Sequence, residues 1–324
     1  MRPLALSAIL AAFAASGIAA DPLPSWAETE NKRRIIEFVD RVTDPRSTDY
    51  VTPSRRIATF DNDGTLWAEQ PVYFQLVYAI DRLLEKASAD PSILSTDALR
   101  AAAAGDMEGM LASGVDGLKE VLAVSHAGVT IEEFQADVRD WLATATHPDT
   151  GLLYGEMIYQ PMLELLSYLR DEGFQTWIAS GGGVHFLRVF AEDTYGIPPE
   201  QVIGSTTPSE YDEALRKVTK QPGIAFVDDK AGKPVGIDTY IGRKPLFAAG
   251  NSDGDFQMLE YTTAEEDGTR LALIVHHTDA EREYAYDRDS HIGKLVRGLD
   301  EGPDRGWVIV DMAKDWTRIW SVQP

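Results

Sequence analysis

Two aspartates separated by one residue follow a short apolar run, and residues 56–66 read RIATFDNDGTL. An apolar run that ends in polar residues and glycine is typical of a buried parallel strand leaving its sheet. Open α/β sheets bind ligands at the carboxyl ends of their strands, so we expect Asp61 and Asp63 at a binding site. A carboxylate can attack phosphorus once a hard divalent cation neutralises the like charges, and a second carboxyl can protonate the leaving alcohol. These residues therefore indicate phosphoryl chemistry.

Residues 61–65 also have simpler interpretations. Asn-Asp-Gly is a common turn sequence, so a hydrophilic turn is one alternative. A calcium loop of the EF-hand type needs glycine at its sixth position, where Leu66 stands counting from Asp61. The EF-hand is therefore excluded.

A glycine-rich loop follows a second apolar run. Residues 174–179 read FQTWIA and residues 180–183 read SGGG. Glycines let the backbone approach a ligand closely, and a helix beginning near Val184 would aim its N-terminal amides at an anion. Ser180 can add a hydroxyl donor beside Gly181, so this loop is a candidate phosphate site.

A lysine at the start of a helix opened by Pro234 could neutralise both a phosphate and a nucleophilic carboxylate. Lys233 has this position in the segment GKPVGIDTYIG, and Lys244 is its competitor. We favour Lys233, because Lys244 stands in a GRKP sequence that is typical of an exposed turn.

These loops resemble the haloacid dehalogenase superfamily, specifically its phosphatase branch. The D-x-D-G-T at 61–65 resembles the first motif, and Ser180 with its glycines resembles the second motif of the phosphoserine phosphatase group. Lys233 resembles the third-motif lysine. The aromatic residue that usually follows the glycines is absent, with Gly183 in its place. The resemblance covers about residues 55–277.

The fourth motif of the superfamily, G-D-x-x-x-D, departs from its pattern here. Residues 250–255 read GNSDGD, so Asn251 stands for the first aspartate and Asp255 for the second. An amide oxygen can bind magnesium but brings no charge, and Asp253 is the alternative ligand. The resemblance implies a Mg²⁺ site formed by Asp61, Asp63, Asn251 and Asp255. It implies phosphate binding by Thr65, Ser180, Gly181 and Lys233.

The remaining pattern predicts an α/β fold with a Rossmann-like, doubly wound and mostly parallel sheet. Between Trp67 and Leu153 the composition changes to helically spaced Ala, Leu, Asp and Glu, and in the superfamily such an insertion is a helical cap. The predicted parts are a signal peptide at 1–20, a helical arm at 21–55, a catalytic core at 56–67 and 154–324, and the cap at 68–153.

The first twenty residues have one charge, Arg2, an apolar stretch and a small-residue end. This pattern predicts a secretory signal cleaved after Ala19 or Ala20 and a periplasmic location. Alanine and glycine dilute the run below the ~20 strongly apolar residues of a membrane span, so no stable membrane association is expected after cleavage.

The composition narrows the partners. A formal net charge of −22 repels phosphate backbones, so we expect a small phosphate monoester and no nucleic-acid polymer. The chain has no cysteine, so a metal must use oxygen or imidazole ligands. His276 and His277 would point to opposite faces of a strand, which favours structural or rim roles.

Glu69 suggests a substrate preference. Related phosphoserine phosphatases place a glutamate close to this point to meet the ammonium group of the substrate. With the aromatic face of Trp67, Glu69 would favour cationic alcohols such as choline, ethanolamine or serine esters. The alternative is that Trp67 only packs between core and cap.

The sequence thus predicts an exported, magnesium-dependent phosphomonoesterase that forms an aspartyl phosphate, with Asp61, Asp63 and Lys233 as catalytic residues. Two alternatives remain open. One is a phosphotransferase to an alcohol acceptor, and the other is a non-catalytic phosphoester-binding protein that lost metal affinity through Asn251.

Overall fold

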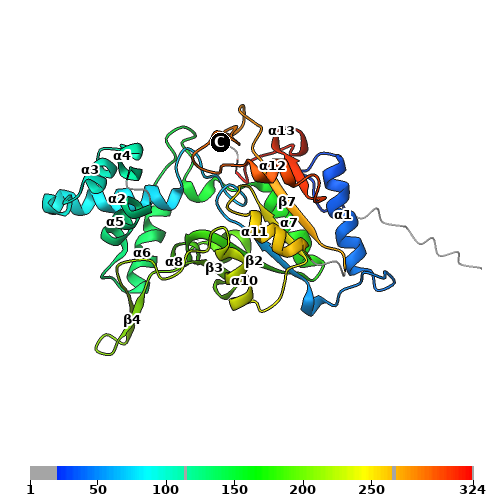
Figure 1. The fold of residues 1–324 in the computed structure, drawn as a ribbon, viewed down its shortest axis with the longest axis horizontal. Coiled ribbons are helices and arrows are strands. Elements are labelled where there is room, and N and C mark those ends of the chain that lie inside the picture. The colour runs from blue at the N-terminus through cyan, green and yellow to red at the C-terminus, as the bar shows by residue number, and fades with distance from the viewer. Residues whose placement is uncertain (1–19, 113–114, 265–267, 323–324) are drawn as a thin grey trace, which may run out of the picture.

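The computed structural model describes residues 20–112, 115–264 and 268–322 (Figure 1). The predicted signal peptide lies outside this part of the chain except for Ala20. Across the described residues, no helix has both the length and the apolar character needed to cross a membrane.

A six-stranded sheet forms the centre of the molecule, in the order β3-β2-β1-β6-β7-β8. Every neighbouring pair in it is parallel, which confirms the predicted Rossmann-like fold class. From β1 the chain adds β2 and β3 on one side, and from β6 it adds β7 and β8 on the other side. The switch point of the doubly wound sheet therefore lies between β1 and β6. The strands are β1 (Ile57–Phe60), β2 (Gln175–Gly183), β3 (Val202–Ser205), β6 (Phe247–Gly250), β7 (Leu271–His276) and β8 (Val308–Asp311).

Both faces of the sheet are covered by helices, as a parallel sheet requires. Neighbouring strand residues alternate between two apolar clusters, with Phe247 and Ala249 in one and Ala248 in the other. The helices of the core are α1 (Glu30–Thr43), α7 (Gln160–Asp171), α8 (Val184–Leu187), α9 (Ala191–Tyr195), α10 (Gly232–Tyr240), α11 (Phe256–Thr263), α12 (Arg297–Glu301) and α13 (Met312–Asp315).

The N-terminal arm and the C-terminal tail pack together on the core. Phe38 of α1 contacts the rings of Phe174 and Phe247, and Trp26 meets Trp316 edge to face at 5.9 Å. Both segments lie outside the motifs, yet they bury large aromatic side chains against the sheet.

The predicted cap region is helical, with α2 (Phe74–Ala89), α3 (Asp97–Ala103), α4 (Met107–Leu111), α5 (Val115–His126) and α6 (Ile131–Leu142). These helices lie on the left of Figure 1, away from α1. Helices α2 to α5 share an apolar cluster of their own, which includes Leu76, Leu83 and Val121, whereas α6 packs into the main core cluster through Phe134 and Trp141. The exact domain boundaries stay a prediction.

An antiparallel hairpin of β4 (Ser209–Asp212) and β5 (Lys217–Lys220) projects below the cap helices in Figure 1. The backbone N–H of Lys220 donates to the Val129 carbonyl at 2.9 Å, and the Gly128 N–H donates to the Lys220 carbonyl at 3.0 Å. A hairpin that follows the second motif in sequence is thus bonded to the cap.

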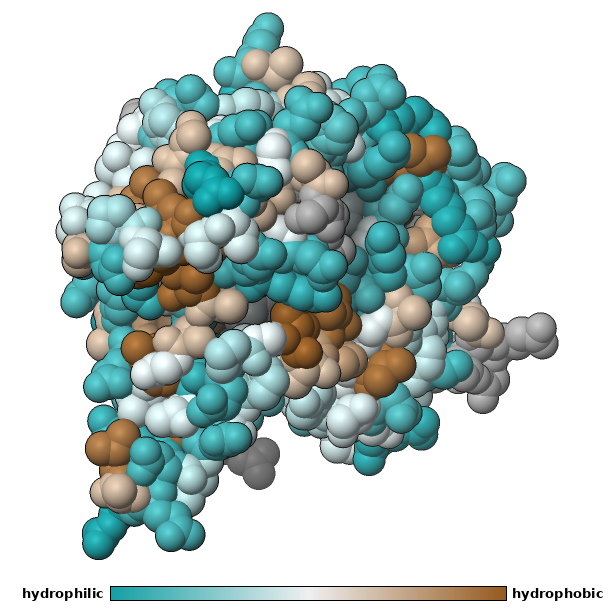
Figure 2. Space-filling view, turned by 60° about the vertical axis from the view of Figure 1, so that its left-hand side comes forward, coloured by the Kyte–Doolittle hydropathy of each residue, from teal (hydrophilic) through white to brown (hydrophobic). Residues whose placement is uncertain are grey.

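The surface is hydrophilic over much of the face shown in Figure 2. Apolar residues gather on that face in separate patches.

Candidate functional site

The first and fourth motifs meet at the switch point of the sheet. Asp61 directly follows β1 and Asn251 directly follows β6, and the Asp61 N–H donates to the Ala249 carbonyl at 2.9 Å. The crevice at such a switch point is where open α/β sheets bind ligands.

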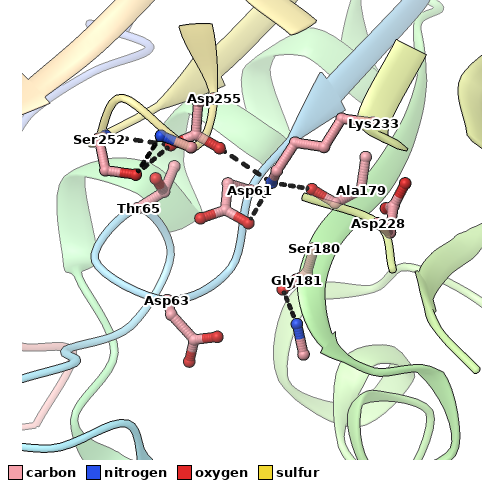
Figure 3. Close-up of polar contacts among 12 residues, drawn as sticks. Asp61, Asp63, Thr65, Ala179, Ser180, Gly181, Asp228, Lys233, Ser252 and Asp255 are labelled. Carbon is pink, nitrogen blue, oxygen red and sulfur yellow. Dashed lines mark hydrogen bonds and ion pairs between the residues drawn. The ribbon is translucent and has the colours of Figure 1, made fainter. Parts of the chain in front are cut away.

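Lys233 lies between two carboxylates (Figure 3). Its Nζ is 2.6 Å from Asp61 Oδ1 and 2.9 Å from Asp255 Oδ1, and it donates to the Ala179 carbonyl at 2.5 Å. The structure thus brings Lys233 to Asp61, as the sequence predicted, whereas the ammonium of Lys244 lies over the Tyr261 ring. Lys233 is second in α10, so the start of this helix places the ammonium at the end of β1.

Negative charge is concentrated around Asp61. Burial raises the pKa of Asp61 well above its usual range, and the Asp255 charge raises it further, while Lys233 opposes both. Burial lowers the pKa of Lys233, but the Asp255 and Asp61 carboxylates outweigh it and raise that pKa above the ordinary lysine value. Lys233 is therefore charged, and its ammonium opposes the rise in the pKa of Asp61.

Asp63 points away from Lys233 (Figure 3). Its Oδ1 accepts a hydrogen bond from the indole Nε1–H of Trp67 at 2.6 Å. Burial raises the pKa of Asp63 to about 6, although the Trp67 hydrogen bond lowers it. A carboxyl with this pKa can both donate and accept a proton near neutral pH.

Trp67 is a buried packing residue as well as a donor. Its ring is 1% exposed and stacks on Phe190 at 4.6 Å, with Phe74 at 5.0 Å. The ring therefore presents no face to a ligand, and the suggestion that it stacks on a cationic alcohol is wrong.

The glycine-rich loop has a different form from the one predicted. β2 continues through the glycines to Gly183, which pairs with Ser205, and α8 is a single turn. The Gly183 N–H donates to Gln75 Oε1 at 2.7 Å, so a cap residue takes the amide that was expected to face an anion. The helix does begin at Val184, as predicted, but it spans only Val184–Leu187.

Ser180 and Gly181 still border the site. Ser180 is fully buried, and its Oγ accepts the Gly182 N–H at 3.1 Å. The Gly181 carbonyl accepts from the Ser205 hydroxyl at 2.8 Å. A Cβ placed on Gly182 would lie 3.6 Å from Asp63 Oδ2, so the glycine loop faces the second aspartate directly.

Asn251 lies between Thr65 and Glu69. Its Oδ1 accepts from the Thr65 hydroxyl at 3.3 Å, and its Nδ2 donates to Glu69 Oε1 at 2.6 Å. The Tyr286 hydroxyl donates to the same Glu69 oxygen at 2.8 Å. Glu69 was predicted as a substrate contact, but its Oε1 is already hydrogen-bonded to Asn251 of the fourth motif and to Tyr286.

Asp255 and Asp253 have different surroundings. Asp255 Oδ2 accepts the N–H groups of Asn251 and Ser252, both at 3.0 Å, which closes the fourth-motif loop. Asp253 accepts three backbone N–H groups at the start of α12, from Val296, Arg297 and Gly298. Asp253 is thus engaged as a helix cap, which leaves Asn251 as the ligand candidate.

His277 supports the first-motif loop, whereas His276 faces another partner. His277 Nε2–H donates to the Gly64 carbonyl at 2.8 Å, and its ring stacks on Tyr286 at 4.3 Å. His276 Nε2 lies 3.2 Å from Asp287 Oδ2. The two histidines therefore diverge, as their positions on one strand predicted.

The donors of this site suit a hard divalent cation. The four carboxylates of Asp61, Asp63, Glu69 and Asp255 line one cavity, where burial and mutual repulsion raise the pKa values of the first three. Among the described residues, no three Asp, Glu, His or Cys side chains converge to hold a metal by themselves. A cation here would need amide, carbonyl or phosphate oxygens as well, which Asn251 and Asp63 can supply in part.

The cavity has a volume of about 390 Å³ and extends from Asp61 and Lys233 into the cap. Gln75, Tyr73 and Phe134 of the cap line it, together with His185 and Lys220. None of these five was predicted, because only the tertiary packing of cap and hairpin brings them to the site.

Comparison with known proteins agrees with this geometry. The sequence model of haloacid dehalogenase-like hydrolases matches residues 58–260, whereas no curated protein sequence matches the chain. A conserved, functionally unknown protein from Anaerococcus prevotii is 17% identical with a TM-score of 0.51, over 76% of this chain and 86% of that one. A protein of unknown function from Bordetella pertussis is 15% identical with a TM-score of 0.51, over 80% of this chain and 99% of that one.

A phosphoserine phosphohydrolase-like protein from Francisella tularensis is 18% identical with a TM-score of 0.41, over 77% of this chain and 98% of that one. At such identities, similarity of structure concerns the fold alone. The family match covers more than half of the chain and includes the loops that carry Asp61, Ser180, Lys233 and Asn251. The chain therefore belongs to the haloacid dehalogenase-like hydrolase family.

Proposed function

We propose that the protein is an exported, magnesium-dependent phosphomonoesterase that hydrolyses small phosphate monoesters through an aspartyl phosphate. One observation carries the proposal. The Lys233 ammonium lies 2.6 Å from Asp61 Oδ1, while Trp67 holds Asp63 on another side of the same cavity. Asp61, the proposed nucleophile, and Asp63, the proposed acid, therefore line the same cavity from different sides.

In the first half-reaction, the free carboxylate oxygen of Asp61 attacks phosphorus as the bond between phosphorus and the alcohol oxygen breaks. Asp63 gives its proton to that departing oxygen, so the alcohol leaves neutral. Lys233 offsets negative charge on the phosphoryl oxygens, beside Thr65, Ser180 and Gly181.

In the second half-reaction, Asp63 is a carboxylate and takes a proton from a water molecule. The water oxygen bonds to phosphorus, and the bond from phosphorus to Asp61 breaks, which releases inorganic phosphate and restores both aspartates. The pKa of Asp63 near 6 supports this double role, because neither protonation state is costly near neutral pH.

Magnesium would be held by the Asp61 carboxylate, the Asp63 carbonyl and the Asn251 amide oxygen, with Asp255 supporting the loop. When bound, the ion would neutralise the repulsion between phosphate and carboxylates. The concentration of buried carboxylates supports this assignment.

Hydrolysis of p-nitrophenyl phosphate with magnesium, and its loss with EDTA, tests the activity. Reduction of the working enzyme with borohydride should convert a phosphorylated Asp61 into homoserine, which peptide mass spectrometry detects. No activity with any phosphate monoester, or a modified residue other than Asp61, would contradict the proposal. Export is tested by N-terminal sequencing of the periplasmic protein, which should begin at Ala20 or Asp21.

A further inference from the structure

Lys220, the last residue of β5, is a buried lysine that lines the cavity. Its side chain is 4% exposed, and it lines the same space as Asp61 and Lys233. Charged side chains are almost never buried unless they are paired, so the surroundings of this ammonium need an explanation.

The contacts of Lys220 are neutral. Its Nζ donates to the Thr207 hydroxyl at 3.1 Å and lies 3.2 Å from His185 Nδ1. It also lies 4.6 Å from the centre of the Phe134 ring. Within the described part of the chain, no carboxylate contacts it.

Burial without a negative neighbour disfavours the charged form of Lys220, which lowers its pKa to about 8. Burial and the charge of Lys220 lower the pKa of His185 to about 4, so the nearby imidazole is neutral and provides no counter-charge. Among the described residues, this buried cation thus has no carboxylate in contact with it.

The position of Lys220 relates it to the leaving group. The Cβ position of Gly182 lies 3.6 Å from Asp63 Oδ2, and His185 follows three residues later in the chain. Lys220 contacts that histidine from the hairpin side. The space between Asp63, which would protonate the leaving oxygen, and Lys220 is therefore where the alcohol part of a substrate would lie.

The walls between these two ends are largely apolar. Leu76, Leu118 and Leu122 of the cap line the cavity, and Phe134 and Phe186 complete this lining. An apolar body suits this stretch, since its burial removes hydrocarbon surface from water.

We propose that Lys220 binds an anionic group, a carboxylate or a second phosphate, on the leaving alcohol of the substrate, whose apolar part fills the cavity between Lys220 and Asp63. This inference rests on the proposed phosphomonoesterase function. It replaces the cationic alcohol suggested by Glu69, because the Glu69 Oε1 already accepts from Asn251 and Tyr286 on the opposite side. A substrate cation at the far end would meet Lys220.

Four esters with the same benzylic leaving oxygen test the preference. They are benzyl phosphate and its para-carboxy, para-phosphono and para-aminomethyl derivatives. We expect kcat/KM for the preferred anionic ester to exceed that for benzyl phosphate by about 10- to 100-fold, mainly through KM, as for a hydrogen bond to a charged group. Comparison of kcat/KM between the para-carboxy and para-phosphono esters shows whether the site prefers a carboxylate or a phosphate-like anion.

Variants assign the preference to Lys220. Lys220→Met should reduce the ratio of anionic to neutral ester to about 1 with little change for benzyl phosphate, and Lys220→Arg should keep part of it. Lys217→Met is the matched control, because it removes the same charge from an exposed position of β5. It should leave the ratio unchanged.

Several results would overturn the inference. They are equal kcat/KM values for benzyl phosphate and its anionic derivatives, a preference for the aminomethyl ester, or a Lys220→Met variant in which kcat/KM falls by the same factor for all four esters. If Lys220→Met does not fold, Lys220→Gln and Lys220→Arg give the same comparison.

A binding experiment separates this inference from the proposed function. Calorimetry should show that the product 4-(hydroxymethyl)benzoate binds the wild-type protein more tightly than benzyl alcohol does, and that Lys220→Met abolishes the difference. This result in a protein without phosphatase activity would support the anion site and reject the proposed function. Activity without the binding difference would reject the anion site alone.

Discussion

The indole Nε1–H of Trp67 donates at 2.6 Å to Oδ1 of Asp63, which stands four residues earlier in the same loop. The ring is fixed by Phe74 and Phe190, so the hydrogen bond fixes one oxygen of Asp63 and leaves the other toward the glycine loop. Trp67 is therefore a positioning residue for the proposed acid, and its packing role and its polar role depend on each other.

Trp67→Phe should remove this hydrogen bond while keeping most of the packing. We expect kcat for benzyl phosphate to fall about 10-fold, because a hydrogen bond to a charged group is lost and Asp63 is less well placed. The rate of the first half-reaction with p-nitrophenyl phosphate, measured as the single-turnover release of nitrophenolate, should change little, because nitrophenolate leaves without a proton. Trp316→Phe is the control, since its buried Nε1 has no acceptor among the described residues. Equal losses with both esters in the single-turnover rate of the first half-reaction would show that Trp67 acts through packing alone.

Asp63→Asn should stabilise the metal-free protein in a pH-dependent way. The pKa of Asp63 is about 6 when folded, against 3.8 for the unfolded reference, so the unfolded state releases the proton first as pH rises. The resulting destabilisation is complete above pH 6 and absent below about 3.8. In EDTA, the variant should gain about 1 to 2 kcal/mol at pH 8 and nothing at pH 3.5, read from urea unfolding. Asp238→Asn, at an exposed position of α10, should show no such trend.

Asn251→Asp should make the protein depend more strongly on magnesium. The Asn251 Nδ2 donates to Glu69 Oε1 at 2.6 Å, so an aspartate would place two carboxylates face to face. We expect a lower Tm without metal, a larger Tm increase with magnesium and a lower magnesium concentration for half-maximal activity. Adding Glu69→Gln should restore the metal-free Tm, because the glutamine amide can donate to the new carboxylate. An unchanged magnesium titration would show that residue 251 is not a ligand.

Gly64→Ala should abolish activity. Gly64 has φ +71°, and an added Cβ would lie 2.0 Å from Asn251 Nδ2 and 2.4 Å from Glu69 Oε1. Gly128→Ala separates strain from crowding, because Gly128 has φ +81° with nothing within 4 Å of the added Cβ. The control should lose about 1 to 2 kcal/mol of stability and retain activity. Retained activity in Gly64→Ala would contradict the described packing of the first and fourth motifs.

Asp61→Asn should remove activity without unfolding the protein. An amide cannot form the acyl phosphate, while Lys233 keeps its ion pair with Asp255 at 2.9 Å. Circular dichroism and Tm should remain close to those of the wild type, with turnover of p-nitrophenyl phosphate at background. Appreciable hydrolysis by the purified variant would reject Asp61 as the nucleophile.

Much of the sheet could be predicted because its strands are buried on both faces and read as continuous apolar runs. The apolar runs expected before Asp61 and at 174–179 correspond to β1 and β2. The helix expected near Val184 does begin there, but the strand predicted to end at Ala179 continues to Gly183, because composition does not show that β2 keeps pairing with β3 through the glycines. Local pattern identifies a strand, but the partner strand decides where it ends.

The polar contacts of the site were harder to predict than its motif residues. Asp61 and Lys233 meet because both stand at element ends whose position follows from the fold. Tyr286, which is 217 residues from Glu69 in the sequence, donates to Glu69 Oε1. The segment around Tyr286 has no periodic pattern from which this contact could be predicted. Lys220 belongs to a polar stretch, and its burial arises from tertiary contacts with Phe134 of the cap and with His185 and Thr207.

The bonding of the β4–β5 hairpin to the cap limits how the molecule can be recombined. A chimera that exchanges only residues 68–153 for the insertion of a relative would leave the backbone groups of Lys220 without their partners at Gly128 and Val129. It would also separate the Lys220 ammonium from the Phe134 ring. The exchangeable module is therefore discontinuous, and it includes the hairpin at 209–220 although this stretch follows the second motif.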